Sequence, residues 1–425
     1  MVLDFGNLPL NWLTMEEILA KTVVLFDLDG VLIKSGGYRA AFRAATNYFL
    51  GKMGLSSDIG PKEHDLVVFE SYGVTAEWDM LPISLAIIFE HCYRLFNENI
   101  ELFTINQALD WVASHRPIDT SVDYESAINN LAPYFWSTSM PAESVLLACQ
   151  DRHGDQLFPL LFRLPLLAQM LSNTRSVTDC MTTLILQNFQ LGDEIFERAF
   201  RIPAEVKTRS LLQMNDRPLL TETNRLELQS LFDQKRIYLA YLTLRPSYPP
   251  RELDLELTGY SPEAELAIEK MDLVNVPLMA YGRMQYLAGQ LNVTTASLVK
   301  PYPYQALAGI MAALDGHELP ALQWTGKIYR MMQQTAVGEK MNSSDLTEIG
   351  LLDDLDIHIF EDMPVGIQST RKAAELLTAF GINVRLTAWG IAYDQLMEAV
   401  LNAQGAQVYS DINLAVQAFF KLVHK

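Results

Sequence analysis

The stretch Val23–Leu32, VVLFDLDGVL, decides the fold. Its first half continues the apolar, β-branched run that starts at Thr22, which predicts a strand buried on both faces, as in a parallel sheet. Asp27 and Asp29 end this strand, and Gly30 then permits a tight departure of the backbone. Two carboxylates at this spacing can share a metal ion or divide the roles of nucleophile and acid/base. A turn at the end of the strand or a calcium-binding loop can have the same sequence pattern.

The rest of the 425-residue chain changes character once. From about Tyr38 to Arg236 the apolar residues recur at helical spacing, and beyond Arg236 strands alternate with helices. This alternation predicts an α/β fold with a Rossmann-like parallel sheet, built from residues 1–37 and 236–425 and interrupted by a helical domain at 38–235. The later strands are expected at Ile237–Leu244, Ala296–Val299, Ile357–Phe360, Asn383–Thr387 and Gln407–Ser410.

Polar residues follow three of these strands, where ligands of parallel sheets bind. Thr243 and Arg245 offer a hydroxyl and a bidentate donor to a phosphoryl group, unless they only open a loop. Lys300, before Pro301, places an ammonium near the first carboxylates, or is a solvated surface residue. Glu361 and Asp362 precede a Gly-led helix and suit a hard cation, or Asp362 caps that helix.

These four motifs, in this order, are those of the haloacid dehalogenase-like (HAD) hydrolase superfamily, which the chain resembles over roughly residues 20–37 and 236–425. VVLFDLDGVL is the most specific of them, and FEDMPVGI looks like the acidic fourth motif. The resemblance implies a HAD-like core with a large helical type-one cap inserted after the first strand. A general acid at position 29 suits phosphate esters, so dehalogenation is not expected.

The resemblance also implies roles. Asp27 would attack phosphorus, and Asp29 would protonate the leaving oxygen and later deprotonate water. Thr243 would bind the phosphoryl group and Lys300 would neutralise it. Mg²⁺ would be held by Asp27, the backbone carbonyl of Asp29, Glu361 and Asp362.

Two features depart from ordinary relatives. The cap is larger than usual, with a hinge expected at Gly36–Arg39 and a first substrate contact at Arg175 within Ser172–Ser176, which is otherwise a helix–helix loop. About sixty residues separate Lys300 from Asp362, and a helix at Leu322–Gln334 and a polar loop at Asn342–Asp345 are expected to fill this gap.

Composition limits the partners. The net charge of −19 argues against nucleic acid and anionic membranes, while a cleft of local positive field still admits a small phosphorylated substrate. Three cysteines without metal spacing favour a reducing cytoplasm, and neither a signal peptide nor a membrane-spanning run is evident.

Three functions fit these observations. The first is a phosphatase for a small phosphorylated metabolite. The second is a phosphomutase of the β-phosphoglucomutase kind, which is also similar in its Glu-Asp fourth motif. The third is a non-enzymatic interaction protein, against which the repelling carboxylates Asp27, Asp29 and Asp362 argue, because binding alone does not require them.

Overall fold

The strand expected before Asp27 lies at the centre of a parallel sheet. The computed structural model describes residues 20–96, 101–115, 121–253, 258–335 and 354–424. β1 (Lys21–Asp27) pairs in parallel with two strands that lie far away in the sequence, and the sheet order is β5-β4-β1-β6-β7-β8. The fold is therefore α/β and Rossmann-like. The other strands of this sheet are β4 (Tyr238–Leu242), β5 (Leu278–Met279), β6 (Leu355–Glu361), β7 (Val384–Ile391) and β8 (Gln407–Tyr409).

Both faces of the sheet are covered by helices, as the apolar run of β1 predicts. Val23 and Leu25 belong to one hydrophobic cluster, whereas Val24 and Phe26 belong to another, because successive side chains of a strand point to opposite faces. On the first face lie α14 (Tyr281–Leu291), α15 (Tyr304–Asp315), α16 (Glu318–Thr335), α18 (Pro364–Ala379) and α19 (Gln395–Ala403). On the second face lie α12 (Glu222–Asp233), α13 (Glu263–Ile268) and α20 (Ile412–Val423).

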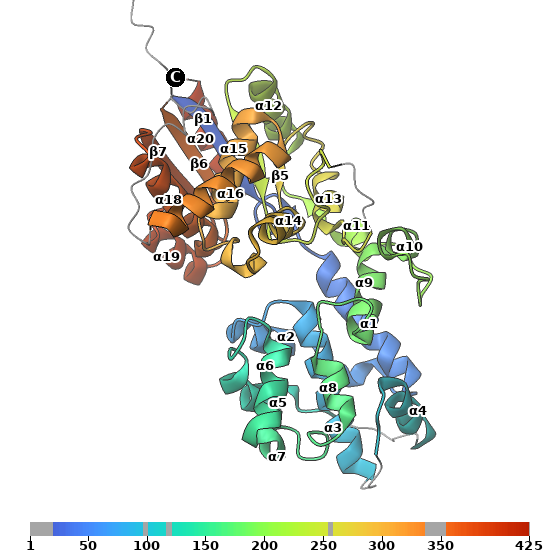
Figure 1. Cartoon of the computed structure of the whole chain (residues 1–425). Coiled ribbons are helices and arrows are strands. Elements are labelled where there is room, and N and C mark those ends of the chain that lie inside the picture. The colour runs from blue at the N-terminus through green and yellow to red at the C-terminus, as the bar shows by residue number, and fades with distance from the viewer. Residues whose placement is uncertain (1–19, 97–100, 116–120, 254–257, 336–353, 425) are drawn as a thin grey trace, which may run out of the picture.

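Most of the residues between β2 (Ile33–Lys34) and β3 (Arg217–Pro218) form a second, helical lobe with a hydrophobic core of its own (Figure 1). This agrees with the helical periodicity of the sequence from residue 38 onward. Its helices are α1 (Gly37–Lys52), α2 (Glu63–Ser71), α3 (Glu77–Phe96), α4 (Ile105–His115), α5 (Tyr124–Leu131), α6 (Pro141–Ala148), α7 (Gly154–Leu157), α8 (Pro165–Leu171), α9 (Met181–Leu191), α10 (Asp193–Phe200) and α11 (Leu211–Asn215).

Two strands of two residues connect the lobes. β2 (Ile33–Lys34) and β3 (Arg217–Pro218) pair antiparallel, so the chain leaves and re-enters the sheet lobe at the same place. α12 then packs on the sheet, since Leu228 and Leu231 share a cluster with Val24. The return to the sheet lobe thus precedes the expected boundary at residue 236.

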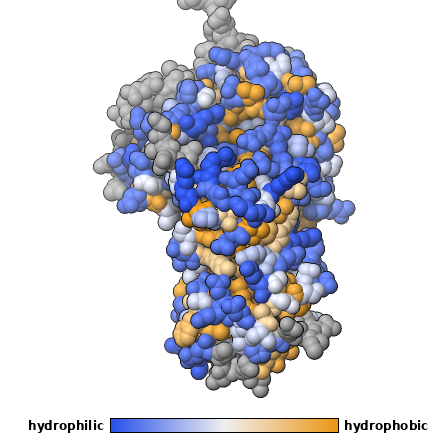
Figure 2. All heavy atoms as spheres, turned by 90° about the vertical axis from the view of Figure 1, so that its right-hand side faces the viewer, coloured by the Kyte–Doolittle hydropathy of each residue, from blue (hydrophilic) through white to orange (hydrophobic). Residues whose placement is uncertain are grey.

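Apolar contacts also join the lobes beside these strands. Leu212 of α11 and Phe196 of α10 form a small cluster with Leu266 of α13. In Figure 1 these three helices lie together on the right-hand side. Figure 2 views that side and shows mostly hydrophilic residues, with hydrophobic ones gathered near the middle of the face.

Two details of the expected strands are corrected. Ala296–Val299 is not a strand: residues 295–297 form a 3-10 turn, and the amides of Leu298 and Val299 donate to the carbonyl of Thr295 instead of to a neighbouring strand. The two-residue edge strand β5 was not expected, because so short a run carries no periodicity. The helix expected at Leu322–Gln334 is confirmed within α16, whereas Asn342–Asp345 lies outside the described residues.

The described residues bear on two sequence-based expectations, about membrane-spanning segments and about disulfides. None of their helices has the length and apolarity needed to cross a bilayer. Cys92, Cys149 and Cys180 are all buried and free of disulfides.

The aromatic stack inside the sheet lobe provides a test of this core. Phe360 of β6 is fully buried between Phe26 and Trp389, with ring centroids 4.6 and 5.5 Å away. We expect Phe360→Ala to lower the free energy of unfolding by about 3–5 kcal/mol, because it leaves a cavity. Denaturant unfolding followed by tryptophan fluorescence measures this. Leu396→Ala, at a side chain 77% exposed, is the control and should change it by less than about 0.5 kcal/mol.

Candidate active site

The chemistry-bearing residues meet where the order of the sheet reverses. The chain runs from β1 to β4 and β5 on one side, and then to β6, β7 and β8 on the other. Asp27 is the last residue of β1, Thr243 follows β4, and Glu361 is the last residue of β6. Crevices at such a switch point, beyond the carboxyl ends of the strands, are where open α/β sheets bind ligands.

Lys300 joins this group despite its distance in sequence. Its Nζ lies 2.7 Å from Asp27 Oδ1, donates to Glu361 Oε1, and lies 3.4 Å from the carbonyl oxygen of Leu242. Burial alone would lower the pKa of Lys300, but Asp27 and Glu361 outweigh burial and raise it, so the ammonium stays charged. The sequence-based placement of Lys300 beside the first carboxylate is thus what the structure has.

A buried glutamine, which sequence reasoning missed, positions the Lys300 turn. Gln305 Nε2 donates to the carbonyl oxygens of Thr243 (2.8 Å) and Met279 (3.0 Å), and its Oε1 accepts from the Lys300 amide (3.4 Å). One side chain therefore ties the end of β4, β5 and the Lys300 turn together. The apolar neighbours of Gln305 in α15 gave no signal of this role.

Three carboxylates could hold a metal ion. Asp27, Glu361 and Asp362 each offer an oxygen, and these oxygens all lie within 4.8 Å of one another. Burial raises the pKa of Asp27, and burial and then the charge of Glu361 raise the pKa of Asp362 to about 7. When these three acids are ionised, the single ammonium of Lys300 leaves the group with a net negative charge. A set of ligands made only of oxygen atoms suits a hard divalent cation.

Two glycines leave the space that these carboxylates occupy. A Cβ on Gly366 would lie 1.6 Å from Glu361 Oε1, and one on Gly30 would lie 1.9 Å from Asp362 Oδ2. Gly30 also has φ +74°, a backbone conformation that favours glycine. The glycine that follows the first aspartates therefore matters for the position of a carboxylate from another strand.

Asp29 sits in a different environment from Asp27. Its carboxylate accepts from Arg245 Nε, at 3.0 Å to Oδ1 and 2.9 Å to Oδ2, and from the Ser35 hydroxyl. Burial alone would raise the pKa of Asp29, but the Arg245 guanidinium outweighs it and lowers the pKa. The Asp29 side chain is outside the three-carboxylate group, and metal binding through its backbone carbonyl stays a prediction.

Arg245 has partners other than the phosphoryl group expected from the sequence. Besides Asp29, its NH1 donates to Asp216 Oδ2 at 2.8 Å, and the guanidinium lies 5.0 Å from the ring centre of Tyr38. Arg245 is buried, at 3% exposure, although it still borders the cavity described below. Its donors thus hold protein carboxylates in place.

Asp216 connects the two linkers between the lobes. Its Oδ1 accepts from the amides of Gly36 (3.1 Å) and Gly37 (2.8 Å), while Oδ2 accepts from Arg245. The hinge expected at Gly36–Arg39 is therefore joined to the returning chain and to Asp29 through one buried carboxylate. Sequence reasoning missed Asp216, because the QMNDRP segment around it follows no recognisable pattern.

A cavity of about 450 Å³ lies over these residues. The sheet lobe and the helical lobe both line it, and the helical lobe contributes the neighbouring residues Thr75–Trp78 together with Tyr38. From the sheet lobe it is lined by Asp27, Asp29, Thr243, Leu244, Arg245, Pro246, Lys300, Glu361, Asp362, Met363 and Val365. All of the predicted site residues except Arg175 meet here.

Arg175 does not reach this cavity, which corrects the expected substrate contact. Its NH2 lies 2.5 Å from Asp79 Oδ2, a carboxylate with no exposed surface, and its guanidinium lies 5.1 Å from the ring centre of Trp78. Arg175 thus contacts Trp78, which lines the cavity, and Asp79, which follows it in sequence. Its buried partner Asp79 lies 96 residues away, which local sequence could not reveal.

Comparison with known proteins adds the fold and no more. No protein-family model matches the chain, and a search of curated proteins finds no match. A similar solved structure is an X-ray structure determined as a target of the Northeast Structural Genomics Consortium, with a TM-score of 0.58 and 14% identity. The match covers 96% of this chain and 100% of that one, so the likeness in fold extends over nearly the whole chain.

The glycine at position 366 allows a test of whether the three carboxylates bind Mg²⁺. We expect Gly366→Ala to weaken Mg²⁺ binding about tenfold or more, because the added methyl group displaces Glu361. Isothermal titration calorimetry measures the affinity. Gly289→Ala, where no atom lies within 4 Å of the added Cβ, is the matched control and should bind as the wild type does. Equal affinities in all three proteins would remove Glu361 from the metal site.

Proposed function

We propose that this chain is a magnesium-dependent phosphomonoester hydrolase of the HAD-like type, with Asp27 as its nucleophile. The observation that carries the proposal is the contact of Lys300 Nζ with both Asp27 and Glu361 at the carboxyl ends of β1 and β6. Lys300 and Glu361 lie about 270 and 330 residues after Asp27 in the sequence. Together with Asp27 they match the first, third and fourth motifs of that superfamily in order and place.

The residues support a two-step reaction. A carboxylate oxygen of Asp27 forms a bond to phosphorus as the ester oxygen leaves with its electron pair. To supply the proton that this oxygen takes up, Asp29 must itself be protonated when the substrate is bound, against the lowering of its pKa by Arg245. Water then attacks the aspartyl-phosphate, giving its proton to Asp29, and phosphate and the free Asp27 carboxylate are restored. Thr243, whose Oγ1 accepts from the Arg245 amide, retains its hydroxyl proton to donate to a phosphoryl oxygen.

Charge neutralisation is what the rest of the site supplies. Lys300 offsets one of the buried carboxylates and remains close enough to meet a phosphoryl oxygen on Asp27. Mg²⁺ held by Asp27, Glu361 and Asp362 would supply the positive charge that lets a phosphate dianion approach. Without these cations, the carboxylates would repel the substrate.

The helical lobe fits the role of a HAD-like type-one cap. It is inserted between β1 and β4, it is joined to the sheet lobe by the paired strands β2 and β3, and it closes one side of the cavity. Such a lobe excludes water from the reacting groups and selects the substrate. A cytoplasmic location belongs to the same proposal.

The nucleophile assignment is tested by one substitution. We expect Asp27→Asn to abolish Mg²⁺-dependent hydrolysis of p-nitrophenyl phosphate, because an amide cannot form the aspartyl-phosphate. Release of p-nitrophenol measures this, and circular dichroism confirms the fold. Asp110→Asn removes one exposed carboxylate from α4 and is the matched control, expected to retain activity. Full activity in Asp27→Asn would refute the assignment.

The contacts of Arg245 with Asp29 and Asp216 predict that the effect of a substitution on kcat/KM depends on the leaving group of the ester. Asp216→Asn removes the charge that holds Arg245, and Arg245 in turn orients Asp29. We expect kcat/KM for an alkyl phosphate, which needs a proton donor, to fall about tenfold further than kcat/KM for p-nitrophenyl phosphate, which does not.

Asp29→Asn should show the same selective loss in a larger form, about a hundredfold. Steady-state kinetics with both esters provides the comparison. Equal losses on the two esters in Asp216→Asn would mean that Asp216 supports the fold and leaves the position of the acid unaffected.

A further inference from the structure

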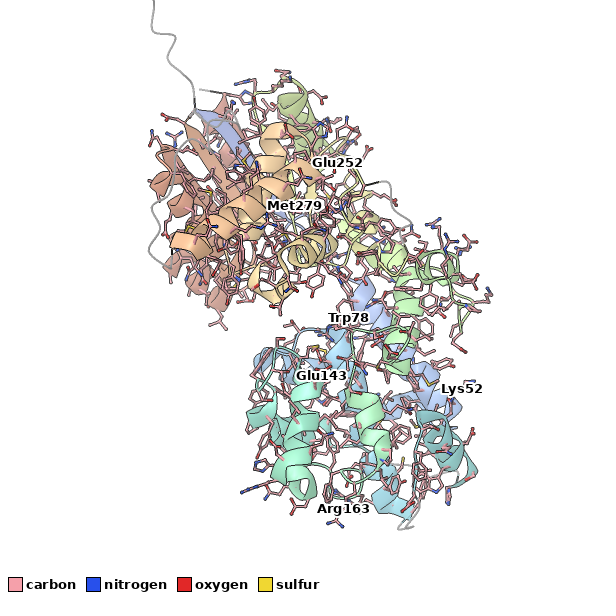
Figure 3. All side chains as sticks on the ribbon, in the orientation of Figure 1. Lys52, Trp78, Glu143, Arg163, Glu252 and Met279 are labelled. Carbon is pink, nitrogen blue, oxygen red and sulfur yellow. The ribbon has the colours of Figure 1, made fainter. Side chains whose placement is uncertain are left out.

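The wall that the helical lobe presents to the cavity is a short, fixed segment. Val74 and Asp79 on either side of it are buried, and Asp79 Oδ1 accepts from the Ala142 amide at 3.2 Å while Oδ2 binds Arg175. Thr75–Trp78 between these anchors lines the cavity, and Figure 3 shows Trp78 at the edge of the helical lobe that faces the sheet lobe. What this segment presents therefore meets the part of a substrate that points away from Asp27.

The charges around the cavity are unbalanced. Its lining includes five carboxylates, from Asp27, Asp29, Glu77, Glu361 and Asp362, and two cationic side chains, from Arg245 and Lys300. A divalent cation would supply two of the three missing positive charges. A phosphate ester brings further negative charge, so the remainder of a well-bound substrate gains most if it is positively charged.

Glu77 is the cavity-lining carboxylate that belongs neither to the group of possible metal ligands nor to an ion pair with Lys300 or Arg245. Among the described residues, no lysine or arginine lies within the 4 Å of an ion pair with it. Arg39, whose charge lowers the pKa of Glu77, pairs with Glu70 and Glu63. Glu77 is partly exposed; its partial burial raises its pKa to about 7, while a hydrogen bond from its own backbone amide opposes this rise. A neighbouring ammonium would favour the ionised form. At the first turn of α3 it also lies near a helix N-terminus, which alone would stabilise the carboxylate and require no ligand.

We infer that the substrate is a phosphomonoester whose alcohol part carries a protonated amine, and that Glu77 binds this ammonium group. The inference rests on the proposed phosphatase function, which assigns the phosphoryl end of the substrate to Asp27 and Lys300. The cavity volume of about 450 Å³ suits a small amino alcohol or amino sugar phosphate. Trp78, the next residue, lines the same cavity and adds apolar surface beside Glu77.

Matched pairs of esters test this inference. Phosphoethanolamine is compared with ethyl phosphate, and glucosamine 6-phosphate with glucose 6-phosphate, by phosphate release in Mg²⁺ at pH 7.5. We expect kcat/KM to favour the amine by about tenfold or more in at least one pair, as one charge-assisted hydrogen bond provides. Glu77→Gln should bring that ratio close to one, and Glu125→Gln, at an exposed acid of α5, should keep it.

A second variant guards against a general loss of activity. Glu77→Lys should reverse the preference and favour a carboxylate-bearing ester such as 3-phosphoglycerate over phosphoethanolamine. Each readout is a ratio of two substrates in one protein, so a change in folded fraction cancels.

Two results would overturn the inference while the phosphatase function stands: equal kcat/KM for amine and neutral esters in the wild type, or an unchanged preference in both Glu77 variants. A wild-type protein that hydrolyses neither these esters nor p-nitrophenyl phosphate would refute the phosphatase function itself.

Discussion

Mutual repulsion of carboxylates is the constraint on which the site depends. Parallel strands end at one edge of the sheet, so Asp27 and Glu361, far apart in the chain, come within reach of a single ammonium from Lys300. Asp362 adds a third acid, positioned beside Gly30. Burial makes each of these charges expensive unless cations neutralise them, so positive charge has to be brought in. A fold that only needed stability would gain more from apolar side chains at these positions.

The same constraint separates two neighbouring aspartates. A single residue separates Asp27 from Asp29, yet their pKa values shift in opposite directions. Burial and the other acids raise the pKa of Asp27, and Arg245 lowers the pKa of Asp29. Each aspartate has its own buried cation: Lys300 also binds Glu361, and Arg245 also binds Asp216. Without a metal ion these directions are the reverse of what the proposed roles need, because a nucleophile acts as the carboxylate and a proton donor as the carboxylic acid. A divalent cation bound by Asp27 would favour its ionised form. The two ion networks thus give two acids of the same kind different environments.

Sequence predicted those parts of this arrangement that local pattern encodes. The apolar run before Asp27 determines a buried strand, and polar residues at later strand ends determined where Thr243 and Glu361 would meet it. Lys300 was placed correctly although its expected strand is a 3-10 turn, because a buried turn brings the side chain to the same edge. Partnerships across the chain could not be predicted: Arg245 with Asp216 depends on how the chain returns to the sheet lobe, and Arg175 with Asp79 depends on how the helices pack within the helical lobe.

The size of the helical lobe has little influence on the sheet, because both connections pass through one place. β2 and β3 pair directly, and Asp216 binds the amides of Gly36 and Gly37, so the ends of the insertion stay together whatever lies between them. The entropy cost of closing a longer insertion grows only slowly with its length. The insertion could therefore enlarge or change the wall that bears Glu77 and Trp78 without moving Asp27 or Lys300. In the proposed phosphatase, reaction chemistry and substrate choice would thus belong to separate parts of the molecule, with Arg245 and Asp216 as the physical connection between them.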